Sequence, residues 1–343
     1  MILHKPGDPW SIDHAQFFAL ASHSERMRFL LSYAILAPSG HNTQPWLFEI
    51  VTDGVEVFAD FDRRLPNIDP DDRELLMSVG AAIMNLRVAA SHFGLGCEVI
   101  TRSPSELDPL AATVKMREPD GTKDRIRELF PAIVMRRTNR QPFNAAPLSS
   151  ESFAALLALA TIHPDAIRFL TDQDKALIAE LVAEGDRVLM ESVEVRGELA
   201  EWLRPLRSAS GDGLYADAFG IPEIFAPAAS SILRRVDLGG MQGRRDAALV
   251  SGAPLVVVLM GDDEGQSLVD AGQILETLLL TVTLSGLQYS FMNQPLQVPA
   301  LRRLLNPVLQ AKQAPQLILR VGYAPEVREP MPRRDLVEVL RGG

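Results

Sequence analysis

Two apolar segments, residues 79–97 and 271–289, carry glycine and leucine at the same relative positions. The matched positions, each pair 192 residues apart, are Gly80 and Gly272, Leu86 and Leu278, Gly94 and Gly286, and Leu95 and Leu287. Glycine is favoured just past the end of a helix, so each segment is predicted to be a long buried helix that ends at a Gly-Leu turn. Four matches can arise by chance in leucine-rich helices, so this spacing alone leaves an internal repeat open.

The extended runs around these segments occur in the same order. Residues 55–59 precede the first segment and residues 255–260 precede the second, and apolar strands at 112–116 and 316–321 follow them. A chain of 343 residues also exceeds the usual size of one domain. These features predict an α+β protein built from two tandem repeats.

We expect an N-terminal half at residues 1–122 and a C-terminal half at residues 123–343. Other elements are predicted by periodicity and capping: a helix at 26–35, a strand at Trp46–Val51, helix starts at residues 69–72 and at Ser149, and a helix at 174–188.

Residues 198–245 mix Gly, Pro, Ser and Arg, and we interpret them as an insertion or lid. The aromatic residues there would form the underside of the lid or pack a small helical subdomain; they are Trp202, Tyr215, Phe219 and Phe225.

Composition narrows the possible functions. The formal net charge of −10 argues against a general nucleic-acid surface, although it permits one local cationic pocket. Cys97, the single cysteine, excludes an intrachain disulfide and is expected to be a small buried side chain. The apolar runs at 254–260 and 274–284 are shorter than the ~20 residues that a membrane span needs, and the first ten residues contain no apolar signal core. We therefore expect a soluble, cytoplasmic protein that binds neither nucleic acid nor membrane.

The segment Ala-Pro-Ser-Gly-His-Asn-Thr-Gln-Pro-Trp at residues 37–46 connects a predicted helix to a predicted strand. Pro38 and Pro45 stiffen its ends, Gly40 permits close backbone approach, and Ser39 and Asn42 offer short hydrogen-bonding side chains. Such a loop suits a planar polar ring such as isoalloxazine. The alternative is a connection whose polar groups only cap the turn.

A second motif, Arg-Arg-Thr-Asn-Arg, spans residues 136–140. Three guanidinium groups and a hydroxyl within one turn are the donors that a phosphate monoester needs. The alternative is a solvated basic turn. Arg333 and Arg334 form another arginine pair near the C-terminus, which indicates little by itself.

Together, these motifs, the Gly-Leu helix ends and the closing arginine pair resemble the nitroreductase superfamily of flavoproteins. In that family an Arg-x-Ser/Thr-x-Arg/Lys signature holds the phosphate of FMN, and a Pro-Ser-x-x-Asn-x-Gln-Pro-Trp loop of the partner subunit contacts the same flavin. Members are usually obligate homodimers of chains a little over half this length. Since each signature occurs once here, the chain resembles the fused, pseudo-dimeric (Acg-like) branch over nearly its whole length.

The resemblance implies a nitroreductase-like fold, in which two repeats, each with a mainly antiparallel sheet flanked by helices, pack as an intramolecular pseudo-dimer. It also implies four groups of FMN-binding residues: the phosphate signature Arg136, Arg137, Thr138, Asn139 and Arg140; the loop residues Pro38, Ser39, Gly40 and Asn42, with His41 between them; Phe291, Met292, Asn293 and Gln294 beside the isoalloxazine ring; and Arg333 and Arg334 at the phosphate.

The chain departs from the family pattern in two places. Residues 9–18 contain no arginine, and residues 161–168 contain no Pro-Ser-x-x-Asn loop. The parts for only one of the two symmetric sites are therefore present, which predicts one FMN per chain, clamped between the halves. Internal pairing also predicts a monomer or a weak homodimer.

By resemblance, the flavin would be reduced by NAD(P)H and reoxidised by a small electron acceptor such as a nitroaromatic or quinone. The flavin would carry the chemistry, so no catalytic side chain and no metal ligand is assigned. One alternative is an FMN storage, sequestration or sensor protein whose lid blocks NAD(P)H. Another is a scaffold that binds no flavin. His41 is expected to be a hydrogen-bonding loop residue.

Overall fold

The computed structural model describes residues 9–119, 125–205, 208, 210–216, 226–309, 312–324 and 330–342. The first half contains an antiparallel sheet of four strands in the order β1-β2-β4-β3. Its elements are α1 (His23–Ala34), β1 (Trp46–Val51), β2 (Gly54–Ala59), α2 (Arg73–His92), β3 (Gly96–Thr101) and β4 (Leu110–Arg117). Helix α1 begins with a capping box, because Ser22 and Glu25 each accept from the other's backbone N–H.

The second half repeats this sheet with the strand order β5-β8-β10-β9, again antiparallel. Its scaffold consists of α3 (Phe130–Met135), α4 (Ser150–Ile162), β5 (Ile167–Phe169), β8 (Leu255–Gly261), α9 (Gly265–Leu284), β9 (Gln288–Phe291) and β10 (Ala314–Gly322). Each strand has a counterpart at the same place in the first sheet. The predicted α+β fold with two tandem repeats is confirmed.

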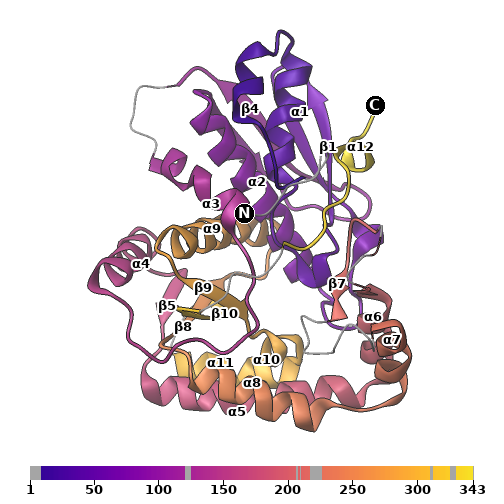
Figure 1. Cartoon of the computed structure of the whole chain (residues 1–343), viewed down its shortest axis with the longest axis vertical. Helices are drawn as coiled ribbons and strands as arrows, with labels where there is room; N and C mark the ends of the chain where they lie inside the picture. Colours follow the sequence, from indigo (N-terminus) through magenta and orange to yellow (C-terminus); the bar gives the residue numbers. More distant parts are fainter. Residues whose placement is uncertain are drawn as a thin grey trace.

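Helices α2 and α9 cross at the centre of the molecule, at the matched glycines (Figure 1). A β carbon on Gly80 would lie 2.0 Å from the carbonyl oxygen of Val269, and one on Gly272 would lie 2.1 Å from that of Met77. A larger residue at either position would force the helices apart. The repeated glycines are therefore the contact point of the intramolecular pseudo-dimer.

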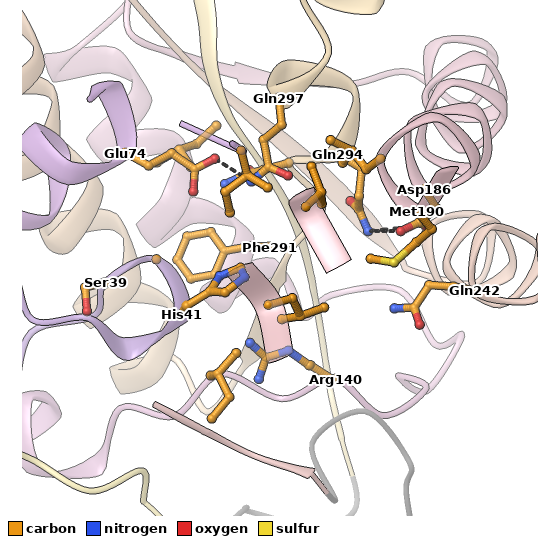
Figure 2. A pocket seen from close by; sticks show the side chains of 18 of the residues that line it. Ser39, His41, Glu74, Arg140, Asp186, Met190, Gln242, Phe291, Gln294 and Gln297 are labelled. Carbon is orange, nitrogen blue, oxygen red and sulfur yellow. Dashed lines mark hydrogen bonds between the residues drawn. The ribbon is translucent and has the colours of Figure 1, made fainter. Parts of the chain in front are cut away.

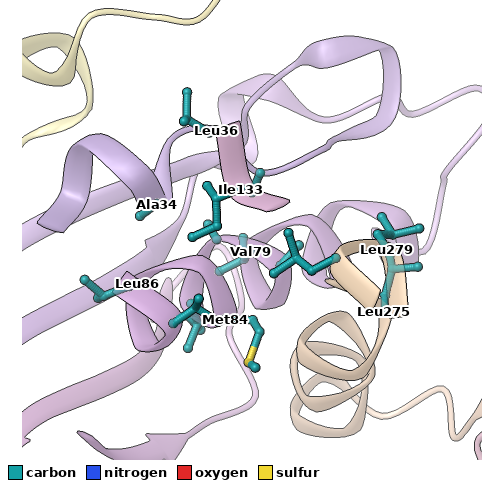
Figure 3. Packing of buried hydrophobic residues seen from close by; sticks show 14 of the residues in the cluster. Ala34, Leu36, Val79, Met84, Leu86, Ile133, Leu275 and Leu279 are labelled. Carbon is teal, nitrogen blue, oxygen red and sulfur yellow. The ribbon is translucent and has the colours of Figure 1, made fainter. Parts of the chain in front are cut away.

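The buried apolar core is continuous across this crossing. Figure 3 shows Val79 of α2, Leu275 and Leu279 of α9, and Ile133 of α3 in one cluster. Both α2 and α9 are long and apolar enough to cross a membrane by length and composition, and most of each lies buried inside the protein. The apolar run at 274–284 is shorter than α9, because the run was taken to start after polar Gln273, which is itself buried in the helix.

The described part of residues 198–245, interpreted above as an insertion or lid, is largely helical and belongs to a longer segment that starts before residue 198. The chain between β5 and β8 folds into α5 (Asp172–Glu191), α6 (Val193–Trp202), β6 (Leu203–Arg204), β7 (Leu214–Tyr215), α7 (Ala226–Arg235) and α8 (Gly239–Ser251). In the first half, a two-residue turn connects the corresponding strands β1 and β2. We call residues 170–254 the insertion.

The insertion has its own small core, which includes Leu199, Leu214 and Leu233. Trp202, one of the aromatic residues considered above, lies outside this core and packs against the cluster of Leu65, Ile68, Leu189 and Val195. Phe219 and Phe225 lie outside the described residues, as does the predicted boundary between residues 122 and 123.

Two further segments complete the fold. Helices α10 (Gln294–Gln297) and α11 (Pro299–Leu309) lie between β9 and β10. After α12 (Leu336–Val339) the chain reaches β1 in the first sheet, where the Arg341 amide donates to the Phe48 carbonyl at 2.8 Å. The last residues of the second half thus fasten onto the first half.

Two local predictions need correction. Helix α2 begins at Arg73, because Asp72 adopts a left-handed conformation (φ 54°) that helix residues avoid. Asp69 nevertheless caps the helix from the preceding turn by accepting from the Leu75 amide at 2.9 Å. Cys97 is half-buried rather than buried, because it lies on β3, a strand that begins directly after the Gly-Leu turn.

Candidate functional site

A cavity of about 400 Å³ lies between the first half, the second half and the insertion. Its walls come from the loop at residues 38–41, the start of α2, Arg140, the segment from Phe291 to Gln297, and helices α5 to α8. Figure 2 shows Ser39, His41, Glu74, Arg140 and Phe291 around this space. A volume of this size is typical of pockets that bind small molecules.

The backbone of the loop at residues 38–44, just before β1, is strained and is held in place by hydrogen bonds. His41, Asn42 and Gln44 have φ values of 47°, 57° and 53°, a region that non-glycine residues rarely adopt. The Gln44 amide donates to Ser39 Oγ at 2.9 Å, and the Gln44 side chain donates to the Gly211 carbonyl at 2.8 Å. Strain of this kind persists only where surrounding contacts fix it, and it is concentrated at functional sites.

Asn42 and the C-terminal arginines hold this loop from behind and do not line the cavity. Asn42 donates to the carbonyls of Gly213 and Pro332 and accepts from Arg333 at 3.0 Å. Arg333 also donates to the carbonyl of Leu36, and the Arg334 amide donates to Gln44 Oε1 at 2.9 Å. Arg333 and Arg334 were predicted at the phosphate and Asn42 among the loop contacts to the flavin, and none of the three lines the cavity.

Arg136 is also turned away from the cavity. Its guanidinium group donates to the Leu36 carbonyl at 2.7 Å and to the Tyr289 hydroxyl at 2.5 Å, and its Nε lies 3.4 Å from Glu276. Burial raises the pKa of Glu276 to about 7, although Arg136 and Arg333 favour its charged form. Arg136 and Arg333 thus lie around one buried carboxylate at the seam between the halves.

Of the remaining residues of the basic turn, 137–140, some contact other parts of the protein and one lines the cavity. Arg137 stacks on Trp10, with its guanidinium carbon 4.3 Å from the ring centroid. Thr138 pairs with Tyr289 in a β-bridge, and the buried Asn139 donates its amide to the Tyr289 carbonyl at 2.9 Å. Arg140 alone of the predicted phosphate residues lines the cavity.

Three of the four residues predicted beside the flavin ring line the cavity. They are Phe291, Asn293 and Gln294, whereas Met292 points into the second apolar core. The reason is strand alternation: β9 ends at Phe291, so neighbouring side chains point to opposite faces.

The structure also places polar residues in the cavity that the sequence analysis missed. They are Glu74, Asp186, Gln242, Arg245 and Gln297. Asp186 is a buried acid on α5 between apolar Val182 and Leu189, a signal that the sequence offered, because acids are rare on the core face of a helix. Glu74 follows a predicted helix start, Gln242 and Arg245 lie in the predicted insertion, and Gln297 lies in a segment with no predicted element. No local pattern marked any of the four.

Burial changes the protonation of these groups. It raises the pKa of Glu74 to about 7 and, with the nearby charge of Asp246, raises the pKa of Asp186 to about 8. Burial and the charge of Arg140 lower the pKa of His41 to about 4. At neutral pH the imidazole is therefore uncharged, and it offers one donor and one acceptor to a bound molecule.

The insertion supplies the apolar wall of the cavity. Its apolar lining residues are Leu189, Met190, Val195, Leu199, Leu203, Leu214, Leu233, Leu238 and Met241. Most of the polar lining groups come from the two halves, and Asp186, Gln242 and Arg245 come from the insertion. Among the described residues, no three His, Cys, Asp or Glu side chains are arranged to hold a metal ion.

The geometry suits a planar cofactor that carries an anionic group. Arg140 and Arg245 line the cavity, and both charges act on Asp246 behind it. The strained loop presents Ser39 and His41 to the same space. The two sequence motifs thus meet at one cavity, through Arg140 rather than through Arg136.

Comparison with known proteins places this geometry in a family. No profile of a known protein family matches the chain. The chain is 30% identical over 328 residues to the Mycobacterium tuberculosis protein named "Putative NAD(P)H nitroreductase Rv3131", covering 92% of this chain and 91% of the relative. It is 28% identical over 322 residues to "Putative NAD(P)H nitroreductase acg" of the same organism, covering 90% and 92%.

Among solved structures, the FMN-dependent nitroreductase NfnB from Mycobacterium smegmatis in complex with NADPH aligns at 20% identity with a TM-score of 0.40, covering 64% of this chain and 99% of that chain. The match to Rv3131 extends over more than nine tenths of both sequences. The chain therefore belongs to the NAD(P)H nitroreductase family.

Proposed function

We propose that this chain is an FMN-dependent oxidoreductase that binds one FMN in the cavity between its halves. NAD(P)H would reduce the flavin, and a nitroaromatic or quinone-like molecule would reoxidise it. The observation that carries the proposal is that the Ser39 loop and Arg140, a hundred residues apart in the sequence, line one cavity with Phe291. Membership of the NAD(P)H nitroreductase family supports the same reaction class.

The residues present fit the cofactor. Arg140 and Arg245 would hold the phosphate, since both are cations in the cavity wall. Ser39, His41 and Gln294 would hydrogen-bond the polar edge of the ring, and Phe291 and the insertion would contact its apolar parts. FMN, when bound, supplies the hydride chemistry, and the protein supplies binding, orientation and exclusion of water.

His41 and the apolar residues of the insertion would have different roles in binding the cofactor. His41 remains uncharged at neutral pH, because burial and Arg140 lower its pKa to about 4. It therefore contributes hydrogen bonds without adding positive charge beside Arg140. The apolar residues of the insertion keep water from the site, which strengthens its polar contacts.

Anaerobic mixing of the purified flavin-loaded protein with NADH or NADPH tests the proposal. We expect the yellow colour of oxidised flavin to bleach, and to return when a quinone is added. Persistent colour would instead indicate a storage or sensor protein whose insertion shuts out the nicotinamide. A colourless protein that does not take up FMN would contradict flavin binding altogether.

A further inference from the structure

The short helix α10 holds two acids of the cavity through two glutamines. Gln297 donates to Glu74 Oε1 at 2.9 Å, and Gln294 donates to Asp246 at 2.9 Å and lies 3.4 Å from both oxygens of Asp186. Gln294 and Gln297 are three residues apart on one helix, so they reach acids from the insertion and from α2, respectively. Nothing in the proposed binding of FMN requires either acid.

Glu74 is the acid that faces the strained loop. Its Oε1 is fixed by Gln297, and its Oε2 would lie 3.8 Å from a β carbon added to Gly40. Figure 2 shows its carboxyl group on the same side of the cavity as His41 and Phe291. Asp186, in contrast, lies on the far side beside Met190 and Gln242.

The surroundings of Glu74 allow its carboxyl group to hold a proton near neutral pH. Burial and the negative charge of Asp69 raise its pKa, while Arg73 and hydrogen bonds from Gln297 and Asn293 lower it, with a resulting value of about 7. Across the cavity, His41 is uncharged at this pH. Arg140, Arg245 and Asp186 are the other charged or titratable groups in the lining.

Reduction of a quinone requires a proton source. A quinone that takes up a hydride from the reduced flavin gains two electrons and one proton, and leaves as a hydroquinone only after its remaining oxygen gains a second proton. A general acid must lie within reach of that oxygen and have a pKa close to the working pH. Glu74 is an acid in the cavity wall beside the predicted position of the ring.

Resting on the proposed function, we propose that Glu74 is the general acid that protonates the oxygen of the electron acceptor. In this step the O–H bond of the Glu74 carboxyl group breaks, and a new O–H bond forms on the acceptor. The hydride comes from NAD(P)H by way of the flavin. The resulting carboxylate, held by Gln297, regains a proton from water.

The test compares two acceptors in stopped-flow reoxidation of the reduced, flavin-loaded protein. Glu74→Gln keeps the shape of the side chain but removes the acid. We expect it to slow reoxidation by a benzoquinone about 100-fold and to abolish the pH dependence near 7. Reoxidation by ferricyanide, which takes electrons without a proton, should keep its rate. Glu74→Asp should restore part of the quinone rate.

Asp186→Asn is the matched control, because it neutralises the other acid held by α10. Whatever its effect on the quinone rate, it should retain the pH dependence near 7. A Glu74→Gln protein that is reoxidised by the quinone at the wild-type rate and with the wild-type pH profile would overturn the proposal. Equal slowing with ferricyanide would do the same, because it would indicate a structural effect.

Two further measurements decide the matter if that variant does not fold or if the wild type is not bleached by NAD(P)H. In the flavin-free protein, the ¹³C signal of the Glu74 carboxyl group should titrate near pH 7, and a midpoint near the ordinary value of 4.5 would contradict the proposal. Gln297→Leu removes a donor to the charged form, so the midpoint should move to higher pH. An unchanged midpoint would count against the arrangement. Absence of bleaching in the wild type concerns the proposed function alone.

Discussion

The two halves have the same sheet and the same central helix, but they differ in the segments that connect these elements. Their sheets have the same strand order, and α2 and α9 occupy positions 192 residues apart throughout their length. Yet β1 and β2 are joined by a tight turn, whereas the insertion of helices α5 to α8 separates β5 from β8. Among the described residues, non-glycine residues with positive φ lie in the first half, three of them in the strained loop at residues 38–44.

We propose that this difference gives the chain one flavin site where symmetry would allow two. The side chain of Glu74 on α2 lines the cavity. Its counterpart on α9 is Gln266, whose backbone amide donates to Ser103 and whose side chain donates to Thr101. The scaffold is thus duplicated, and the site arises where the duplication is broken. Substitutions at positions that match between the halves, and at positions that differ, therefore test this account.

The largest effect is expected at Glu276, which has Met84 as its counterpart on α2. Glu276→Met makes the seam symmetric, but it leaves Arg136 and Arg333 buried without their acid. We expect a loss of about 3–5 kcal/mol in the free energy of unfolding, measured by urea denaturation. Met84→Leu, which conserves volume, should cost less than about 1.5 kcal/mol. A stable Glu276→Met protein would show that the buried charges are not coupled.

The symmetric glycines give the next effect. Gly80→Ala and Gly272→Ala should each destabilise the protein by about 3 kcal/mol, because the added methyl group meets a backbone carbonyl of the other helix. Similar losses at both positions would support the pseudo-twofold crossing. Gly286→Ala is the control: it has a φ of 70° but open space around it, so it should cost only about 1 kcal/mol. Unfolding curves for the three variants would settle the comparison.

Arg140 tests the asymmetric cavity. Arg140→Ala should weaken FMN binding by about 2 kcal/mol, or roughly 30-fold, because a charge-assisted hydrogen bond to the phosphate is lost. Fluorescence titration with FMN measures this change. Arg28→Ala, at an exposed position on α1, should leave the affinity unchanged. An equal affinity in the Arg140 variant would remove Arg140 from the site.

The last prediction concerns a slope, the change of stability per pH unit. Because the pKa of Asp186 is raised to about 8 in the folded protein, the folded state holds a proton that the unfolded chain releases near pH 4. Stability should therefore fall as the pH rises from about 4 to about 8. Asp186→Asn should flatten this slope by up to about 1.4 kcal/mol per pH unit. An identical slope in the variant would indicate that Asp186 titrates normally.

Much of the fold could be predicted from local patterns. The strand Trp46–Val51 and the helix that starts after Ser149 have the predicted bounds, because turn residues and capping side chains mark them. The matched glycines and the matched order of the extended runs together predicted the repeat. Glycine is required at the helix ends and at the crossing of α2 and α9. The helical insertion was missed, because a small core formed by Leu199, Leu214 and Leu233 outweighs a composition typical of loops.

The site was predictable only in part. The sequence identifies two motifs but not which side of each motif faces the cavity. Arg136 is withdrawn from the cavity by Glu276 and Tyr289, two residues of the second half that no local pattern connects to it. Glu74 follows the predicted helix start at residues 69–72 and was assigned no role, because its hydrogen bond to Gln297, more than two hundred residues later, leaves no local pattern.

The number of FMN molecules bound per chain tests the central claim most directly. Protein purified with saturating FMN, freed of excess ligand and denatured, gives this ratio from the absorbance of the released flavin against the protein concentration. The account predicts one FMN per chain, with loss of binding in a variant whose loop from Ser39 to Asn42 is replaced by glycine. A ratio near two, or undiminished binding without the loop, would contradict a single site built where the two halves differ.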